Sequence, residues 1–167
     1  SVKEVAELLK SAKRPLFIFG GGARSAPDAA RELLDLGGAA CFVTYAGKGT
    51  VSSAYPLNFG ATLGRNESKR VIASADLVIA LGTHLAEVDL WRDFLGHEAP
   101  MVRVDIDPQV LSDWHRADIR ILGDAPSFMY QLAESLKDQA PAPGWSADEI
   151  KKAQQSFRAD ADAARPG

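Results

Sequence analysis

The chain places glycines directly after an apolar run, a pattern that can bind a phosphate group. In "LFIFGGGAR", Gly20, Gly21 and Gly22 follow four apolar residues and precede a helix-forming segment. Glycine lets a ligand approach the backbone, and exposed N–H groups at the start of a helix favour an anion. The segment is therefore a candidate phosphate-binding turn, although a glycine turn by itself has low specificity.

Later apolar runs end in residues that could contact the rest of a nucleotide. These run ends are Gly82-Thr83-His84, Asp105-Ile106-Asp107 and Gly123-Asp124. Aspartate can accept hydrogen bonds from ribose hydroxyls or from an adenine amino group. Asp107 has a simpler explanation, because aspartate before proline is typical of a helix N-cap. Asp105 has no such explanation, and we favour a ligand contact for it.

Two standard nucleotide motifs do not fit. Gly20 and Gly22 match the first two positions of the dinucleotide fingerprint, but Ser25 occupies the third. The next apolar run ends in Thr44 and Tyr45, where an acidic residue would hold the ribose. The segment "AGKGT" lacks the spacing of a Walker loop. The residues thus suit an adenosine diphosphate group and disfavour a standard nicotinamide site.

Catalytic groups are hard to assemble from this sequence. His97 and His115 have no second histidine or cysteine at ligand spacing, which disfavours a metal site. Cys41 lies inside an apolar run, where a small buried thiol is the simplest interpretation. The residues alone predict a binding crevice and no reaction machinery.

Composition limits the class of protein. The 167 residues are 46% hydrophobic and 25% charged, with a net charge of -3, which fits one globular domain without a basic surface for nucleic acid. A single cysteine excludes an intrachain disulfide and fits a reducing compartment. No apolar run reaches the length of a membrane span, and we expect a cytoplasmic protein with no membrane partner.

Helical and strand patterns alternate along the chain. We expect strands at 16–19, 39–45, 58–64, 76–82, 100–108 and 119–124, and helices at 2–12, 27–36, 67–74 and 125–139. This alternation predicts an α/β fold: a three-layer, doubly wound, Rossmann-like sheet of about six parallel strands in the order 3-2-1-4-5-6. Since parallel strands end at one edge of a sheet, the residues named above would meet there.

The last part of the chain breaks this pattern. "APAPGW" at 140–145 is typical of a linker, and the polar, alanine-rich residues after it have little to bury. We therefore expect a domain at 1–140 and a polar connector at 141–167.

Six segments in one order resemble a known family. "RPLFIFGGGAR", "FVTYAGKGTV", "PLNFGATLG", "ADLVIALGTHLAEVD", "VRVDIDP" and "ILGDA" resemble the central domain of thiamine-diphosphate-dependent enzymes. The closest branch is that of acetolactate synthase and related 2-oxo-acid decarboxylases and lyases, and the likeness covers residues 3–137. Sirtuin-like and electron-transfer-flavoprotein-like nucleotide domains share the fold class but not this order.

The resemblance implies a larger parent enzyme. Such enzymes have a pyrimidine-binding domain before the central one and a pyrophosphate-binding domain after it, and these two hold thiamine diphosphate and Mg²⁺. The resemblance therefore implies that this chain alone is inactive, within a transferase or lyase that is a homodimer or homotetramer.

The resemblance also implies a bound nucleotide. The central domain holds FAD in acetolactate synthase, ADP in oxalyl-CoA decarboxylase and no dinucleotide in relatives of pyruvate decarboxylase. The positions that match the flavin contacts are Gly20, Gly21, Gly22, Leu63, Gly64, Arg65, Gly82, Thr83, His84, Asp105, Ile106 and Asp124. The flavin-binding branch usually has arginine in place of His84. Two alternatives stay open: FAD or ADP bound non-catalytically, or an architectural domain that spaces the two catalytic domains with an empty crevice.

Overall fold

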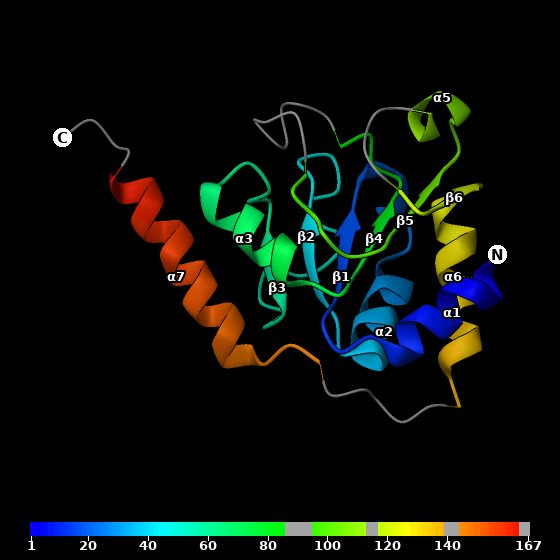
Figure 1. Ribbon diagram of the computed structural model, residues 1–167, viewed down its shortest axis with the longest axis horizontal. Coiled ribbons are helices and arrows are strands. Elements are labelled where there is room, and N and C mark those ends of the chain that lie inside the picture. Colours follow the sequence, from blue (N-terminus) through cyan, green and yellow to red (C-terminus); the bar gives the residue numbers. More distant parts are fainter. Residues whose placement is uncertain (86–94, 113–116, 139–143, 164–167) are drawn as a thin grey trace.

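Six parallel strands form the central sheet of this protein (Figure 1). The computed structural model describes residues 1–85, 95–112, 117–138 and 144–163, with the side chains of the last helix described as far as 159. The strands are β1 (Pro15–Phe19), β2 (Ala40–Val43), β3 (Asn58–Gly60), β4 (Leu77–Leu81), β5 (Met101–Asp105) and β6 (Ile119–Leu122). Their order, β3-β2-β1-β4-β5-β6, confirms the predicted fold class and strand order.

Helices cover both faces of the sheet and complete three layers (Figure 1). The helices α1 (Val2–Ser11), α2 (Pro27–Gly37) and α6 (Ala125–Leu136) cover one face. The other face carries α3 (Asn66–Ser74) and α7 (Ala147–Ala163). Two short helices, η1 (Gly21–Ala23) and α5 (Pro108–Leu111), follow strand ends.

The central strand β1 contributes to two separate cores, because successive side chains point to opposite faces. In β1, Phe17 and Phe19 pack with α1, α2 and α6, whereas Leu16 and Ile18 pack with the residues of α3 and α7. All four side chains are fully buried. Burial on both faces explains why this strand is a continuous apolar run in the sequence.

Local sequence signals set the helix ends as expected. Pro27 stands at the first position of α2, and Gly38 ends this helix in the left-handed conformation with φ 59°. The Asp107 carboxylate accepts a hydrogen bond from the Gln109 N–H (N···O 2.9 Å) and caps α5. The capping function predicted for Asp107 is therefore confirmed.

The last helix buries more than its composition suggests. Trp145, Ile150 and Phe157 are buried in the core between α3, α7 and the sheet. The Trp145 indole N–H also donates to the Pro15 carbonyl oxygen (N···O 2.7 Å). The expectation that this segment has little to bury is wrong, because its few large apolar residues all face the sheet. The expected boundary at 140/141 lies outside the described residues.

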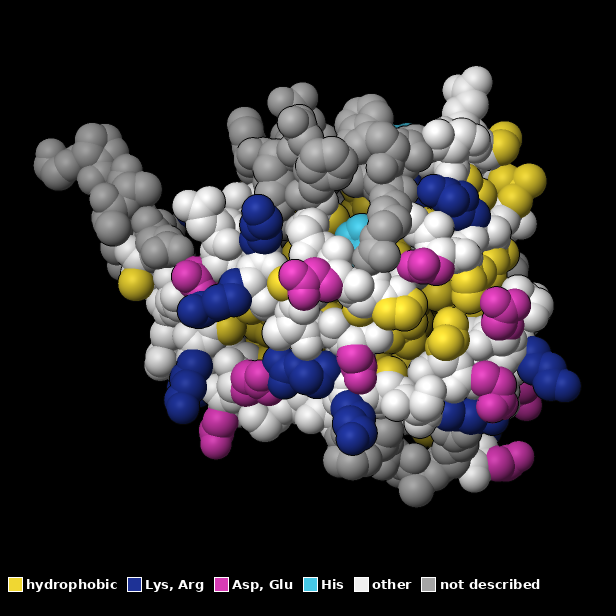
Figure 2. All heavy atoms as spheres, viewed as in Figure 1, with side chains coloured by type: hydrophobic (Ala, Val, Ile, Leu, Met, Phe, Trp, Pro, Cys, Tyr) yellow, Lys and Arg dark blue, Asp and Glu magenta, His cyan; other side chains and the backbone are white. Residues whose placement is uncertain are grey.

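The surface carries charges of both signs. On the face in Figure 2, Lys and Arg side chains lie among Asp and Glu side chains over the described residues. Within the described ranges, the helices are too short or too polar to cross a bilayer.

Candidate functional site

The predicted site residues follow strand ends, and these ends lie at one edge of the sheet, at the top of Figure 1. Backbone hydrogen bonds extend the sheet by one residue here. The Gly20 N–H donates to the Leu81 carbonyl oxygen (N···O 2.9 Å), and the Gly82 N–H donates to the Val104 carbonyl oxygen (N···O 2.9 Å). The loops after β1, β4 and β5 are therefore held in a fixed relation to one another.

Three glycines are required by the close approach of the loops after β1 and β4. A Cβ added at Gly20 would lie 2.3 Å from the Gly82 carbonyl oxygen, and one at Gly22 would lie 2.9 Å from the Gly82 Cα. Gly82 itself has φ +63°, a conformation that favours glycine. We call Gly20, Gly22 and Gly82 the glycine crossing. Its glycines are needed whether or not a ligand binds.

Most N–H groups of the turn after β1 are bonded within the protein. The Gly22 N–H donates to the Gly82 carbonyl oxygen (N···O 3.1 Å), and the Ala23 N–H donates to the Gly20 carbonyl oxygen (N···O 3.1 Å). The Arg24 N–H donates to the carbonyl oxygen of Gly21 (N···O 3.3 Å). Within the described residues, the exposed Gly21 has no acceptor for its own N–H. Of the three glycines predicted to contact a phosphate, Gly21 is thus the one whose N–H has no acceptor among the described residues.

The end of β5 offers groups that suit a nucleoside. Asp105 is buried, and one carboxylate oxygen, Oδ1, accepts a hydrogen bond from the Asp107 N–H (N···O 2.9 Å). Its other oxygen, Oδ2, has no donor among the described residues. Ile106 is 73% exposed and presents an apolar surface beside this carboxylate. An acceptor next to an exposed apolar side chain can bind a ribose hydroxyl and pack against a base.

The loop after β4 uses most of its polar groups internally. The buried guanidinium of Arg103 donates from Nη2 to the Thr83 carbonyl oxygen (N···O 3.1 Å). The Thr83 hydroxyl accepts a hydrogen bond from the Leu85 N–H (N···O 3.1 Å). His84 is exposed, so it is the residue of this predicted trio whose side chain can reach a ligand.

The third predicted segment lies at a distance from the others. Leu63, Gly64 and Arg65 follow β3, which three strands separate from β5. At about 4.8 Å per strand, the ends of β3 and β5 are roughly 19 Å apart. Leu63 is buried, whereas Arg65 is exposed and lines a cavity with α7. The loop that carries Arg65 therefore follows a strand well removed from the end of β5 along the sheet.

Asp124 has a structural function. Its carboxylate accepts hydrogen bonds from the Ser127 hydroxyl (O···O 2.8 Å) and the Ser127 N–H (N···O 3.0 Å), and it caps α6. These hydrogen bonds hold the pKa of Asp124 below its ordinary value. The cap accounts for an aspartate at this strand end without a ligand.

Comparison with known proteins identifies the fold family. The family model described as "Thiamine pyrophosphate enzyme, central domain" matches residues 2–132. The chain belongs to this family. The resemblance seen in the sequence is therefore confirmed.

Relatives of this thiamine pyrophosphate enzyme central domain have several activities. A probable 2-ketoarginine decarboxylase of Pseudomonas aeruginosa is 38% identical over 146 residues, 85% of this chain and 26% of that protein. An acetolactate synthase of Mycobacterium avium is 30% identical over 149 residues, 86% of this chain and 24% of that protein. A pyruvate oxidase of Lactiplantibacillus plantarum is 27% identical over 150 residues, which are 89% of this chain and 25% of that protein. The chain spans about a quarter of the length of these relatives.

Two residues at the carboxyl edge were missed by the sequence reasoning. Arg103 fixes the Thr83 carbonyl group, and its signal was a charged residue between Val102 and Val104 in an apolar strand. Tyr45, at the end of β2, was noted only as the wrong residue for a nicotinamide site. It is 50% exposed, and Lys48 lies over its ring at 5.3 Å from the centroid.

Reactive groups are scarce in the described part of the central domain. No group of three or more His, Cys, Asp or Glu side chains is placed to hold a metal ion there. Burial raises the pKa of the Cys41 thiol well above its ordinary range, so the reactive thiolate is disfavoured.

Proposed function

We propose that this chain is the central domain of a longer decarboxylase or carboligase and that it binds an adenosine diphosphate group without taking part in the reaction. The names of its relatives, a decarboxylase, a synthase and an oxidase, support a parent enzyme that acts on 2-oxo acids. Their greater length leaves room for pyrimidine-binding and pyrophosphate-binding domains. Those domains would hold thiamine diphosphate and Mg²⁺ and supply the carbanion chemistry.

The observation that carries this proposal is the set Gly21, Asp105 and Ile106, which we call the ligand-facing set. It combines an N–H without a described acceptor, a carboxylate oxygen without a described donor, and an exposed apolar side chain. These are complementary to a phosphate, a ribose hydroxyl and an adenine ring, respectively. The backbone bonds between the loops fix the set before a ligand arrives, which lowers the entropic cost of binding.

The separation of β3 from β5 distinguishes the two nucleotides. ADP needs only the loops after β1, β4 and β5, whereas FAD is long enough to reach Arg65 as well. A substitution of Arg65 by glutamine should therefore lower the affinity for FAD and leave the affinity for ADP unchanged. Equal losses for both nucleotides would contradict this placement.

The second candidate is an architectural domain that spaces the two catalytic domains. A specific observation favours it: the glycine crossing is explained by loop packing, and its N–H groups are bonded within the protein. In that case the crevice stays empty in the parent enzyme, and the glycines serve the fold alone.

Titration with ADP and FAD separates the two candidates. At a ligand concentration of 100 Kd, binding should stabilise the chain by about 2.7 kcal/mol, which a melting curve detects. A Gly21→Ala variant adds a methyl group next to the N–H that would bind the phosphate. Its Cβ would lie 3.1 Å from the Ala46 Cβ, a tight contact that a small shift relieves.

The matched control is Ser25→Ala, an exposed position in the same loop. We expect the nucleotide-dependent shift in the native chain and in the Ser25→Ala variant, and its loss in the Gly21→Ala variant. If neither nucleotide shifts the melting curve of the native chain, nucleotide binding is refuted and the architectural function is favoured.

A further inference from the structure

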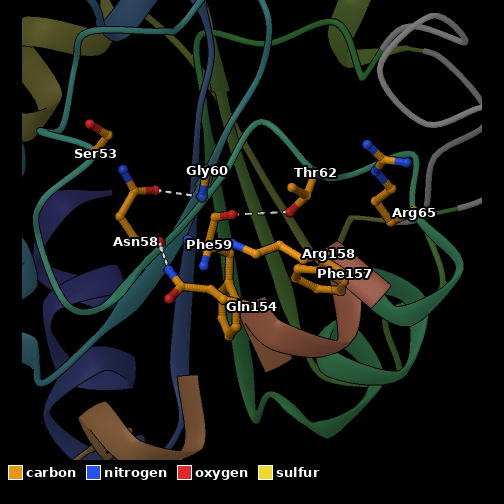
Figure 3. Close-up of a pocket in the computed structure, with 9 residues that line it drawn as sticks. All are labelled: Ser53, Asn58, Phe59, Gly60, Thr62, Arg65, Gln154, Phe157 and Arg158. Carbon is orange, nitrogen blue, oxygen red and sulfur yellow. Dashed lines mark hydrogen bonds between the residues drawn. The ribbon is translucent and has the colours of Figure 1, made fainter. Parts of the chain in front are cut away.

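A cavity of about 280 Å³ lies at the end of β3, between the loop after this strand and the second half of α7 (Figure 3). Phe59 of β3 and Phe157 of α7 are among the residues that line it; their ring centroids are 6.0 Å apart at an interplanar angle of 66°, and both side chains are almost fully buried. None of the nucleotide contacts proposed above for ADP lies in it. Arg65, proposed above as a contact of FAD but not of ADP, does line it, so the cavity is distinct from the proposed ADP site.

The charged residues that line this cavity are both arginines, Arg65 and Arg158, and no carboxylate lines it within the part of the chain whose side chains are described. Neither guanidinium has an acidic partner among the described residues. Other arginines on the same side of the sheet are paired: Arg70 with Glu67 (N···O 2.5 Å) and Arg14 with Glu149 (N···O 2.5 Å). Two unpaired guanidinium groups at one cavity favour an anion, since arginine binds carboxylate and phosphate groups with paired N–H donors.

The walls of the cavity are fixed without the arginines. The Gln154 side-chain amide donates to the Asn58 carbonyl oxygen (N···O 2.7 Å) and joins α7 to β3. The Thr62 hydroxyl donates to the Phe59 carbonyl oxygen (O···O 3.1 Å). In Figure 3, the Arg158 side chain runs across the cavity toward β3, and Arg65 stands at the rim. Both cations remain available in a preformed cavity.

We propose that this cavity binds a small organic carboxylate. Its volume is close to the lower limit of about 300 Å³ for small-molecule pockets, which suits a single ring. The carboxylate would accept hydrogen bonds from Arg158 and, after a rotation of its side chain, from Arg65.

Benzoate is a suitable probe, because it is a carboxylate on one aromatic ring. Titration calorimetry or ligand-observed NMR of the native chain should show saturable binding in roughly the millimolar range. An Arg158→Gln variant should bind benzoate at least about tenfold more weakly, since a hydrogen bond to a charged group is lost. An Arg65→Gln variant should be weakened in the same direction.

Arg70→Gln is the matched control, because Arg70 is an exposed arginine of α3 that does not line the cavity. Its affinity for benzoate should equal that of the native chain, and benzyl alcohol, which lacks the charge, should bind at least about tenfold more weakly than benzoate. Equal affinity for benzoate in Arg158→Gln and the native chain, or no saturable binding to the native chain, would overturn the proposal. Because Arg158 lies outside the ligand-facing set, its variant should keep ADP binding, so this test and the nucleotide test fail independently.

Discussion

The glycine crossing and the ligand-facing set lie at the same edge of the sheet. They differ in whether their hydrogen-bonding groups are already bonded within the protein. In the crossing, Gly20 and Gly22 contact Gly82 so closely that a side chain on either would collide with backbone. The N–H groups of the crossing are bonded within the protein, whereas the Gly21 N–H of the ligand-facing set has no acceptor among the described residues. Adjacent glycines in one motif therefore serve different purposes, and only some of them indicate a ligand.

The largest expected effect concerns Gly20. A Gly20→Ala substitution places a Cβ against the Gly82 carbonyl oxygen, and we expect a loss of about 3 kcal/mol or more in the free energy of unfolding. The Gly21→Ala substitution should cost less than about 1 kcal/mol, because its nearest contact, the Ala46 Cβ at 3.1 Å, needs a shift of only a few tenths of an ångström. Urea unfolding of both variants measures the difference. Equal stability of the two variants would remove the distinction between the crossing and the ligand-facing set.

A smaller effect is expected from Asp105→Asn, which tests the ligand-facing set directly. Asparagine keeps an oxygen for the Asp107 N–H, so the turn is preserved, while the negative charge that accepts from ribose is lost. We expect ADP affinity to fall about tenfold, as for the loss of a hydrogen bond to a charged group, with little change in the melting temperature. Asp107→Asn is the control, because Asp107 caps α5 and its variant should bind ADP normally. A normal ADP affinity in Asp105→Asn would argue against the ribose contact.

The smallest effect is expected at Asp124, and it depends on pH. Hydrogen bonds from Ser127 lower the pKa of Asp124 in the folded protein from its ordinary value of 3.8. The cap therefore stabilises the fold above that value, and the stabilisation is lost as the pH falls through the lowered pKa of the folded state. Asp124→Ala should melt at a lower temperature than the native chain at pH 7, and the difference should shrink in strong acid.

ADP affinity provides the control for this substitution. If Asp124 serves only as a cap, Asp124→Ala keeps its affinity for ADP, and Asp124→Asn keeps most of the stability as well, since asparagine is also a good cap. A large loss of ADP affinity with an unchanged melting temperature would instead add Asp124 to the ligand-facing set.

The sequence predicted the sheet well because its signals are local. Apolar runs such as Leu16–Phe19 have the pattern of strands buried on both faces, and Pro27 and Gly38 mark where a helix begins and ends. The short strand β3 was the weakest prediction, and it forms only over Asn58–Gly60. Three residues alone do not specify a strand, and pairing with β2 holds them in the extended conformation.

Contacts between distant segments were beyond the reach of the sequence. The N–H groups of the turn after β1 are bonded because β4 lies next to β1, a neighbour more than 50 residues away in the chain. The packing of α7 was missed for a similar reason: Ile150 and Phe157, with Trp145 just before the helix, are too few and too widely spaced to give a strong helical pattern. Periodicity shows that a face is apolar, but it does not show which distant surface will cover it.

The most direct test follows backbone amide signals by NMR while ADP is added to the native chain. Binding at the ligand-facing set predicts large, saturable shifts at Gly21 and Ile106, smaller shifts at the already bonded amides of Gly20 and Gly22, and none in α1. Shifts that are absent from the carboxyl edge, or confined to another part of the molecule, would contradict the account.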